Sequence, residues 1–216
     1  MLRIASTLVL LTACAVANAQ NISPSDSPLR AHFSYIKGNA NLDIGPNSAE
    51  VAGTSMLTTL NYKFAEKFYA EAGYGKSSAD SMSINGASAA LDDNSTTTTM
   101  LGLGYLRPKS NKIGQYWGVG YQTVSSDDPD EDGSNILKIL SQKNTSQRFG
   151  EVSFQRASSE SGSINSLAGT HIWFIQPGLG LGFEWALSGA KLDAEAFGAE
   201  GELTEQAAGI VFMYRP

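Results

Sequence analysis

The sequence predicts an all-β protein: a transmembrane, antiparallel, up-and-down β-barrel of about ten strands. In residues 178–185 (GLGLGFEW), large apolar side chains alternate with glycine or a charged residue, and residues 209–214 (GIVFMY) also place large apolar side chains on alternate positions. Side chains of a strand point alternately to its two faces, so each run has one strongly apolar face. Only 17% of the residues are charged. In a secreted chain this poor in charge, we expect the apolar face to contact lipid and the other face to line a lumen.

Residues 1–19 are predicted to be that secretion signal. Arg3 supplies the positive start, residues 4–16 form an apolar stretch too short to span a bilayer, and Ala17-Asn18-Ala19 is a small-x-small cleavage site. Cleavage before Gln20 would leave 216 − 19 = 197 residues with a net charge of 14 − 21 = −7, because Arg3 is removed. A second hypothesis stays open, since residues 11–14 (LTAC) fit the lipoprotein pattern in which Cys14 is acylated.

Composition excludes several other classes of protein. After the signal, no window of about eighteen consecutive apolar residues occurs, which excludes a helical membrane protein. The net negative charge, without a cluster of Lys and Arg, argues against nucleic-acid binding. Cys14 is the only cysteine and leaves with the signal, so the mature chain forms no internal disulfide. Residues 20–30 are polar and are expected to form a periplasmic lead-in, and residues 31–216 the barrel domain.

Ten strands are expected, near residues 31–38, 56–64, 68–75, 96–106, 115–123, 136–143, 148–156, 170–186, 191–198 and 207–214. Short connections at 65–67, 108–112 and 188–189 alternate with long polar ones at about 39–53, 77–94, 125–135 and 158–169, which is typical of barrels with tight turns on one side of a membrane. Eight strands remain an alternative if residues 125–147 form a single loop. Pro177 cannot donate to a strand ladder, so a bulge or bend is expected there.

The alternation assigns a face to each side chain. Lipid-facing side chains are expected at Phe33, Tyr35, Leu60, Tyr62, Phe64, Leu101, Leu103, Tyr105, Trp117, Val119, Tyr121, Val152, Phe154, Leu179, Leu181, Phe183, Trp185, Ile210, Phe212 and Tyr214. Their neighbours are expected to face the lumen, among them Ser34, Asn61, Lys63, Glu71, Gly102, Gly104, Gly118, Gly120, Glu151, Ser153, Gln155 and Glu184. Aromatic residues near the short turns would form a girdle at the lipid headgroups.

With these features the chain resembles the small, porin-like outer-membrane β-barrel family of Gram-negative bacteria. The most specific part of the resemblance is the final strand, where Gly209, Phe212 and Tyr214 match the spacing of the family's C-terminal assembly signal. Ala207, at a position that is usually polar, and Arg215-Pro216, after the aromatic that normally ends the chain, depart from it. The resemblance implies location in the bacterial outer membrane, recognition by the barrel-insertion machinery, contact with outer-membrane lipid and lipopolysaccharide, and a monomeric state.

The lumen charges allow two interpretations. Lys63, Glu71, Glu151 and Glu184 are predicted to point inward, with Arg148 and Lys191 as further candidates. Side chains nearly fill a barrel of about eight strands, and ten strands add little room, so the first interpretation is a set of ion pairs that plugs the barrel. The second is a narrow pore for small solutes, whose selectivity these charges would set. The expected role is therefore structural, surface-interacting or pore-forming.

An outer-membrane lipid-modifying enzyme is an alternative of another class. His32 and Ser34 share one strand face, and Glu71 or Glu184 could lie across the lumen, as a hydrolase or acyltransferase would need. The ten-stranded omptin proteases use carboxylates, but Asp92-Asp93 lies in a much shorter loop than theirs. No catalytic residue and no cofactor are therefore assigned. A soluble periplasmic ligand-binding barrel or a lipoprotein is the remaining alternative, and it would bury the alternating apolar face.

The densest acidic cluster offers a weak candidate for a metal site. From Asp128 the sequence reads D-x-D-x-D-G through Asp130 and Asp132, which is how a calcium-binding loop begins. Ile139 stands at the twelfth position in place of the bidentate Glu. A solvated acidic loop is the simpler interpretation, with weak divalent-cation binding as the alternative.

Overall fold

The computed structural model describes residues 29–89, 95–110, 114–128, 133–159, 162–192 and 201–216, and the predicted secretion signal, with Cys14, lies outside them. These residues form eleven strands: β1 (Leu29–Ile44), β2 (Asn47–Lys63), β3 (Phe68–Ile84), β4 (Ala87–Ala89), β5 (Ser95–Pro108), β6 (Gln115–Ser126), β7 (Ser134–Asn144), β8 (Arg148–Ser159), β9 (Gly162–Gln176), β10 (Leu179–Leu192) and β11 (Gly201–Tyr214). Within the described ranges, no helix is long and apolar enough to cross a membrane.

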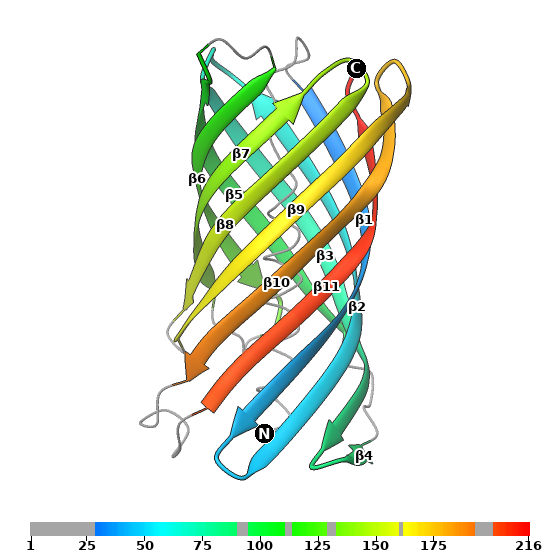
Figure 1. Cartoon of the computed structure of the whole chain (residues 1–216), viewed down its shortest axis with the longest axis vertical. Helices are drawn as coiled ribbons and strands as arrows, with labels where there is room; N and C mark the ends of the chain where they lie inside the picture. Colours follow the sequence, from blue (N-terminus) through cyan, green and yellow to red (C-terminus); the bar gives the residue numbers. More distant parts are fainter. Residues whose placement is uncertain (1–28, 90–94, 111–113, 129–132, 160–161, 193–200) are drawn as a thin grey trace.

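The sheet closes into a barrel of ten antiparallel strands (Figure 1). With β4 set aside, each strand pairs with the strands before and after it, so that β3 pairs with β5. β1 completes the ring by pairing with β11 from Ala31↔Tyr214 to Ile44↔Gly201. β4 pairs with β3 alone and extends one hairpin. Closure satisfies the backbone hydrogen bonds of what would otherwise be two sheet edges. The predicted fold class is confirmed, and the eight-strand alternative is wrong because β7 forms.

The two ends of the barrel differ. At one end, called here the turn end, short connections join β2 to β3, β5 to β6, β7 to β8 and β9 to β10, and β1 starts and β11 ends there (top of Figure 1). At the opposite end, called here the loop end, lie the β1–β2 turn and the β3–β4 hairpin, and β6, β8 and β10 end there. The predicted short connections at 65–67 and 108–112 lie at the turn end, whereas β1 and β2 at the loop end are also joined by a short turn, Gly45-Pro46.

Several predicted boundaries are wrong. Most of residues 39–53, 77–94 and 158–169, expected as long loops, belongs to β1, β2, β3, β8 and β9. The expected strand 170–186 is two strands, because Pro177-Gly178 forms a tight turn in which Gly178 has φ 81°. The expected turn at 188–189 lies inside β10. That strand continues to Leu192, and residues 193–198 of the expected strand 191–198 lie outside the described ranges. The count of ten strands is still correct, because the split of 170–186 adds one strand and the merging of the expected strand 191–198 into β10 removes one.

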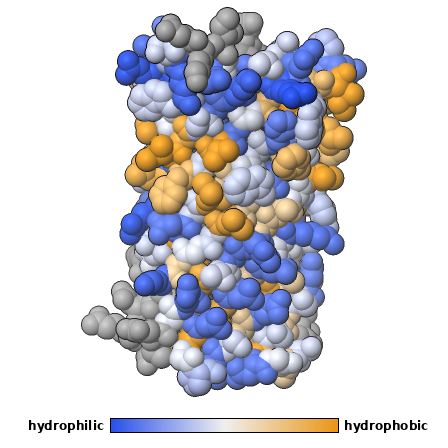
Figure 2. All heavy atoms as spheres, in the orientation of Figure 1, coloured by the Kyte–Doolittle hydropathy of each residue, from blue (hydrophilic) through white to orange (hydrophobic). Residues whose placement is uncertain are grey.

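The outer face of the barrel changes from apolar near the turn end to polar near the loop end. Near the turn end the outer face carries exposed apolar side chains, called here the apolar belt: Phe33, Leu60, Tyr62, Leu101, Leu103, Trp117, Val119, Leu137, Ile139, Val152, Phe154, Leu181, Phe183, Ile210 and Phe212. Near the loop end the outer face is polar and exposed, with Lys37, Asn41, Asp43, Glu50, Asp80, Arg156, Asn165, Lys191, Glu202 and Thr204. Figure 2 shows the hydrophobic side chains gathered in a band over the upper half of one side.

The inner face does not simply mirror this pattern, because apolar clusters lie near both of its ends. Near the loop end it is apolar and buried, with Ala40, Leu42, Ile164, Ala190 and Leu203 in one cluster and Val51 with Met82 in another. A core of this kind with a polar outer surface is stable in water, whereas the exposed apolar belt is stable only in lipid. The barrel therefore extends well beyond the membrane at its loop end. An exposed belt also contradicts the soluble-barrel alternative.

Two arginine substitutions on the outer face of β2 test its change of polarity. Leu60→Arg places a charge within the apolar belt and is expected to lower the free energy of unfolding in lipid vesicles by roughly 2–4 kcal/mol. Glu50→Arg, on the same face near the loop end, is expected to change it by less than about 0.5 kcal/mol. Urea unfolding followed by tryptophan fluorescence measures both. Equal losses in the two variants would show that the belt is misplaced.

Candidate functional site

Polar side chains fill the interior at the depth of the apolar belt. This group, called here the lumen belt, comprises Arg30, His32, Asn61, Glu71, Gln122, Lys138, Gln142, Glu151, Gln155 and Glu184, none more than 4% exposed. They come from β1, β2, β3, β6, β7, β8 and β10. Strand alternation places them here, because each flanks outward side chains that contact lipid. The belt is the largest collection of buried polar groups in the described part of the chain.

A stripe of glycines on β5 and β6 makes room for large side chains. Gly102, Gly104, Gly118 and Gly120 face inward, and the Tyr69 ring from β3 lies directly over Gly104. A Cβ on Gly120 would lie 2.7 Å from the Tyr69 hydroxyl, and one on Gly102 would lie 2.5 Å from Cγ of Gln122. The glycines therefore do not widen a channel, because side chains of neighbouring strands occupy the space they leave.

Hydrogen bonds tie the carboxylates to side chains on other strands. Gln122 Nε2 donates to Glu71 Oε1 at 2.7 Å, which links β6 to β3 across Gly102. Gln142 Nε2 donates to Glu151 Oε2 at 3.0 Å, linking β7 to β8. Hydrogen bonds to a charged acceptor are roughly twice as strong as neutral ones. They stabilise charges that would be costly to bury alone.

Electrostatic contacts cross the lumen. Arg30 of β1 is close enough to interact with Glu151 of β8, and His32 interacts with both Arg30 and Lys138 of β7. Tyr69 of β3 interacts with Glu71 and also with Glu151, although β5, β6 and β7 separate β3 from β8 around the wall. The charges of side chains from distant strands therefore influence one another inside the barrel.

Apolar clusters flank the middle of the lumen belt, whereas Arg30 and Gln142 lie nearer the turn end than these clusters do. Towards the turn end lie two clusters, Phe149 with Ile172, Val211 and Met213, and Tyr69 with Leu106 and Leu140. Towards the loop end lie Ile36 with Ala168, Ala186 and Ala207, and Met100 with Val124, Ile136 and Ala157. Lys138 and Glu184 therefore lie between apolar clusters, in agreement with their burial.

Arg215 lies at the turn end and makes contacts that the sequence did not predict. The residue follows the expected C-terminal aromatic, where the assembly signal normally ends. Its guanidinium carbon stacks 3.7 Å above the Phe174 ring. Its nitrogens donate to Asn144 Oδ1 at 3.1 Å and to the carbonyl of Ser146 at 3.1 Å. Arg215 thereby connects the end of β11 with the β7–β8 turn. A cation following the last strand was the only sequence signal for this contact.

The structure places the predicted lumen charges in different positions. Glu71, Glu151 and Glu184 belong to the lumen belt, whereas Lys63 is half-buried at the end of β2, paired with Tyr69. Arg148 and Lys191 are exposed on the outer face, so the proposal that they face the lumen is wrong. On their strands, both residues fall on the alternate positions whose side chains point outward. For Lys191, the turn wrongly expected at 188–189 interrupted this alternation.

The residues considered for catalysis are sealed inside the barrel. His32 and Ser34 share the inner face of β1, and Glu184 lies close to Ser34. The ring nitrogens of His32 have no hydrogen-bond partner among the described residues, and the ring packs edge-on against Phe149 with centroids 6.3 Å apart. A nucleophile activated by a base needs a hydrogen bond between the two. His32 makes no such bond among the described residues. Asp92-Asp93 lies outside the described residues.

The acidic loop is only partly described. Asp130 and Asp132 lie outside the described residues, and within them no group of three potential metal-ligating residues occurs. Asp127 Oδ1 accepts a hydrogen bond from the Thr97 backbone N–H at 2.7 Å, which holds the pKa of this exposed carboxyl below its usual value. The Asp128 N–H donates to Ser126 Oγ at 3.1 Å. These contacts fasten the end of β6 to β5.

The residues of the predicted assembly signal lie on β11. Phe212 and Tyr214 are exposed on the outer face, at 43% and 54%. Gly209 faces inward, where a Cβ would collide with the Tyr35 carbonyl across the β1–β11 seam. Glycine is therefore required locally for barrel closure. Recognition by the insertion machinery stays a prediction.

Comparisons with known proteins agree with this geometry. The family model described as outer membrane protein beta-barrel domain matches residues 6–215. The outer membrane protease OmpT from Escherichia coli has a similar structure, with a TM-score of 0.53 and 9% identity over 91% of this chain and 99% of that chain. The translocator domain of the autotransporter NalP from Neisseria meningitidis follows with a TM-score of 0.44 and 11% identity, covering 99% and 98% of the two chains.

A KdgM porin, solved in complex with disordered oligogalacturonate, has a TM-score of 0.44 and 9% identity and covers 87% of this chain and 99% of that chain. No curated protein matches the sequence. At these identities, the likeness to OmpT shows a shared fold and nothing about activity.

Substitution in the glycine stripe tests the packing of the lumen. Gly104→Ala would force the buried Tyr69 ring to move, and overpacking of this kind typically lowers the free energy of unfolding by about 1–3 kcal/mol. In the matched control Gly189→Ala on β10, the added Cβ would make only an ordinary 3.6 Å contact with the Leu203 carbonyl, and little change is expected. Denaturant unfolding in detergent micelles measures both. An unchanged midpoint for Gly104→Ala would contradict the tight interior.

Removal of the Arg215 guanidinium tests the closure at the turn end. Arg215→Ala loses hydrogen bonds from a charged donor and the stacking on Phe174, so the free energy of unfolding is expected to fall by about 1–3 kcal/mol. Arg215→Lys keeps the charge but cannot donate to several acceptors at once, and should lose less. Guanidinium unfolding followed by tryptophan fluorescence gives the comparison. Identical stability of wild type and Arg215→Ala would show that these contacts are incidental.

Proposed function

Since the chain belongs to the outer membrane protein β-barrel domain family and is located in the bacterial outer membrane, we propose that it is a sealed barrel that acts at the cell surface. In this proposal the half within the apolar belt is an anchor. The turn end faces the periplasm, and the loop end stands outside the cell, as the short turns and long hairpins of such barrels do. The barrel does not serve as a pore.

The observation that carries this proposal is the burial of the lumen belt. A pore needs a continuous water path, which would wet the polar side chains that line it. Here the Lys138 side chain is 0% exposed and that of Glu184 is 1% exposed, and apolar clusters lie on both sides of them. The lumen charges therefore support a buried, mutually compensating network.

The loop end supports a surface role because it is an ordered wall. The turn Asn85-Gly86, with φ 51° and 78°, joins β3 to β4. Its Asn85 N–H donates to the Ser48 carbonyl, and the Ser48 N–H donates to Asn85 Oδ1, both at 2.9 Å. These bonds join the β3–β4 turn to the β1–β2 hairpin. A platform ordered before binding loses less conformational entropy when a partner binds.

The polar outer face of this wall is suited to hydrated partners. We place lipopolysaccharide headgroups and other extracellular polar macromolecules in that class, and we place the insertion machinery at β11. A monomer is sufficient for this role, because closure leaves no strand edge free in the ring.

Electrical recording tests whether the barrel is sealed. Folded wild-type protein, verified by its faster migration on an unheated gel, is expected to give no conductance steps in planar lipid bilayers. A variant with Tyr69, Gln122 and Lys138 all replaced by alanine opens the interior and checks that a channel would be detected. Regular steps from the wild type, with an ion selectivity that Lys138→Glu reverses, would overturn the proposal in favour of a narrow pore.

A further inference from the structure

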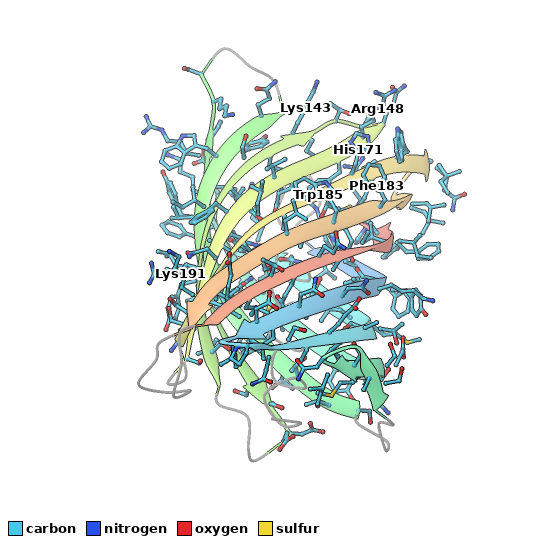
Figure 3. All side chains as sticks on the ribbon, turned by 60° about the horizontal axis from the view of Figure 1, so that its bottom comes forward. Lys143, Arg148, His171, Phe183, Trp185 and Lys191 are labelled. Carbon is cyan, nitrogen blue, oxygen red and sulfur yellow. The ribbon has the colours of Figure 1, made fainter. Side chains whose placement is uncertain are left out.

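The outer face of β7–β10 is hollowed near the turn end. A groove of about 570 Å³ lies there, and Lys143, Arg148, Gly150, His171, Phe183 and Trp185 contribute to its lining. Figure 3 shows the labelled side chains of this set near one end of these strands, with Lys191 at the far end of β10. We propose that this groove binds an anionic phospholipid of the periplasmic leaflet. The inference rests on the orientation of the barrel and is independent of whether the lumen conducts.

Strand register explains why a groove forms. Across the barrel wall, Lys143 pairs with Gly150, Gly150 with His171, and His171 with Phe183. Gly150 carries no side chain, and the nearest atom to a Cβ built there would be His171 Nδ1, 3.7 Å away. The floor of the groove is therefore bare backbone at Gly150, between a cationic side chain on β7 and an aromatic one on β9.

The far wall of the groove is aromatic. His171 packs against Trp173 with ring centroids 4.3 Å apart and stacks on Phe183 at 5.8 Å. The Trp185 indole lies over Gly169, 2.7 Å from the position of a Cβ. Rings held in this way form a smooth apolar surface for an acyl chain, and indole and imidazole tolerate the headgroup boundary.

Positive charge distinguishes this groove from a similar one. Lys143 and Arg148 are both exposed at its turn-end rim, and the acidic lining residue Glu151 turns its side chain into the lumen, where it accepts from Gln142. A second groove of about 510 Å³, over β2, β3, β5 and β6, is lined by Leu60, Tyr62, Leu101, Leu103 and Tyr121 among others and contains neither Lys nor Arg. Lipid chains can cover both grooves, but only the first offers partners for a phosphate.

Depth in the membrane identifies the occupant. The turn end faces the periplasm, so the two cations lie at the headgroups of the leaflet that consists of phospholipid. Arginine and lysine bind phosphate oxygens by charge-assisted hydrogen bonds. The headgroup phosphate binds between Lys143 and Arg148, and one acyl chain passes over Gly150 along Phe183 and Trp185.

Fluorescence quenching by brominated lipid tests the site directly. Trp117 and Trp173 are changed to phenylalanine, which leaves Trp185 as the single fluorophore in the mature chain. The folded protein is placed in phosphatidylcholine vesicles that contain a small fraction of brominated phosphatidylglycerol or, in parallel, brominated phosphatidylcholine. Quenching by the anionic lipid is expected at a much lower fraction, because each cation near a phosphate contributes about fivefold to binding.

Charge variants separate this site from general attraction to anionic lipid. In the same background, Lys143→Gln with Arg148→Gln should remove the preference, a loss of roughly 25-fold for two cations. Lys37→Gln with Lys191→Gln removes the same amount of charge elsewhere on the outer face and should keep the preference for anionic lipid. The exchange Lys143→Arg with Arg148→Lys preserves both charges and should keep most of the preference for anionic lipid. It shows whether a loss in the first pair comes from the missing charges or from a folding defect. Equal quenching by both lipids in the wild-type groove, or equal losses in the two glutamine pairs, would overturn the proposal.

Discussion

The structure depends on one constraint, which is that the barrel wall passes from lipid to water along the length of its strands. A β-strand offers two faces with a fixed period of two, and the barrel gives one face to the outside throughout. Where the outside is lipid, that face must be apolar, as at Leu60 and Ile139. Where it is water, the same face is polar, as at Glu50 and Asn135. The inner face must then become a core at the loop end, which Leu203 and Met82 provide.

The lumen belt follows from the same constraint. Inside the apolar belt the inner face is left for polar groups, but ten strands enclose too little room for bulk water once those groups are large. Charges such as Glu71 and Lys138 are therefore buried, and burial is tolerable only with partners. The glutamine amide on Glu71 and the opposing charges around Glu151 meet this requirement. The glycine stripe completes the packing by accepting Tyr69.

In the sealed barrel that we propose, function lies on the outer surfaces. The loop end presents hairpins bonded to one another at Asn85 and Ser48, and the turn end carries the groove at Gly150 with its two cations. Both features lie on the outside of the wall or at its rim. The two proposals therefore place hydrated partners at the loop end and lipid at the turn end.

Sequence alone determined the class of fold and the faces. Side-chain alternation is a local property, so Leu181 could be assigned outward and Glu184 inward without knowledge of any neighbour. It also placed Glu71, Glu151 and Glu184 in the lumen, although it could not tell a network from a pore. That difference depends on which side chains from distant strands meet, as Gln122 meets Glu71 across Gly102. The pairing of strands far apart in the chain decides such contacts.

Strand length, the turn at Pro177 and the role of Arg215 were decided by the tertiary structure. Residues 39–53 looked like a loop because their outer side chains are polar, and only the closed barrel shows that Ala40, Leu42 and Val51 form a core with other strands. The groove at Gly150 was equally invisible, because four strands contribute to it. Sequence thus determined the alternation of polarity, which each strand carries by itself. Tertiary structure decided burial, sealing and surface shape, because these depend on the register between strands.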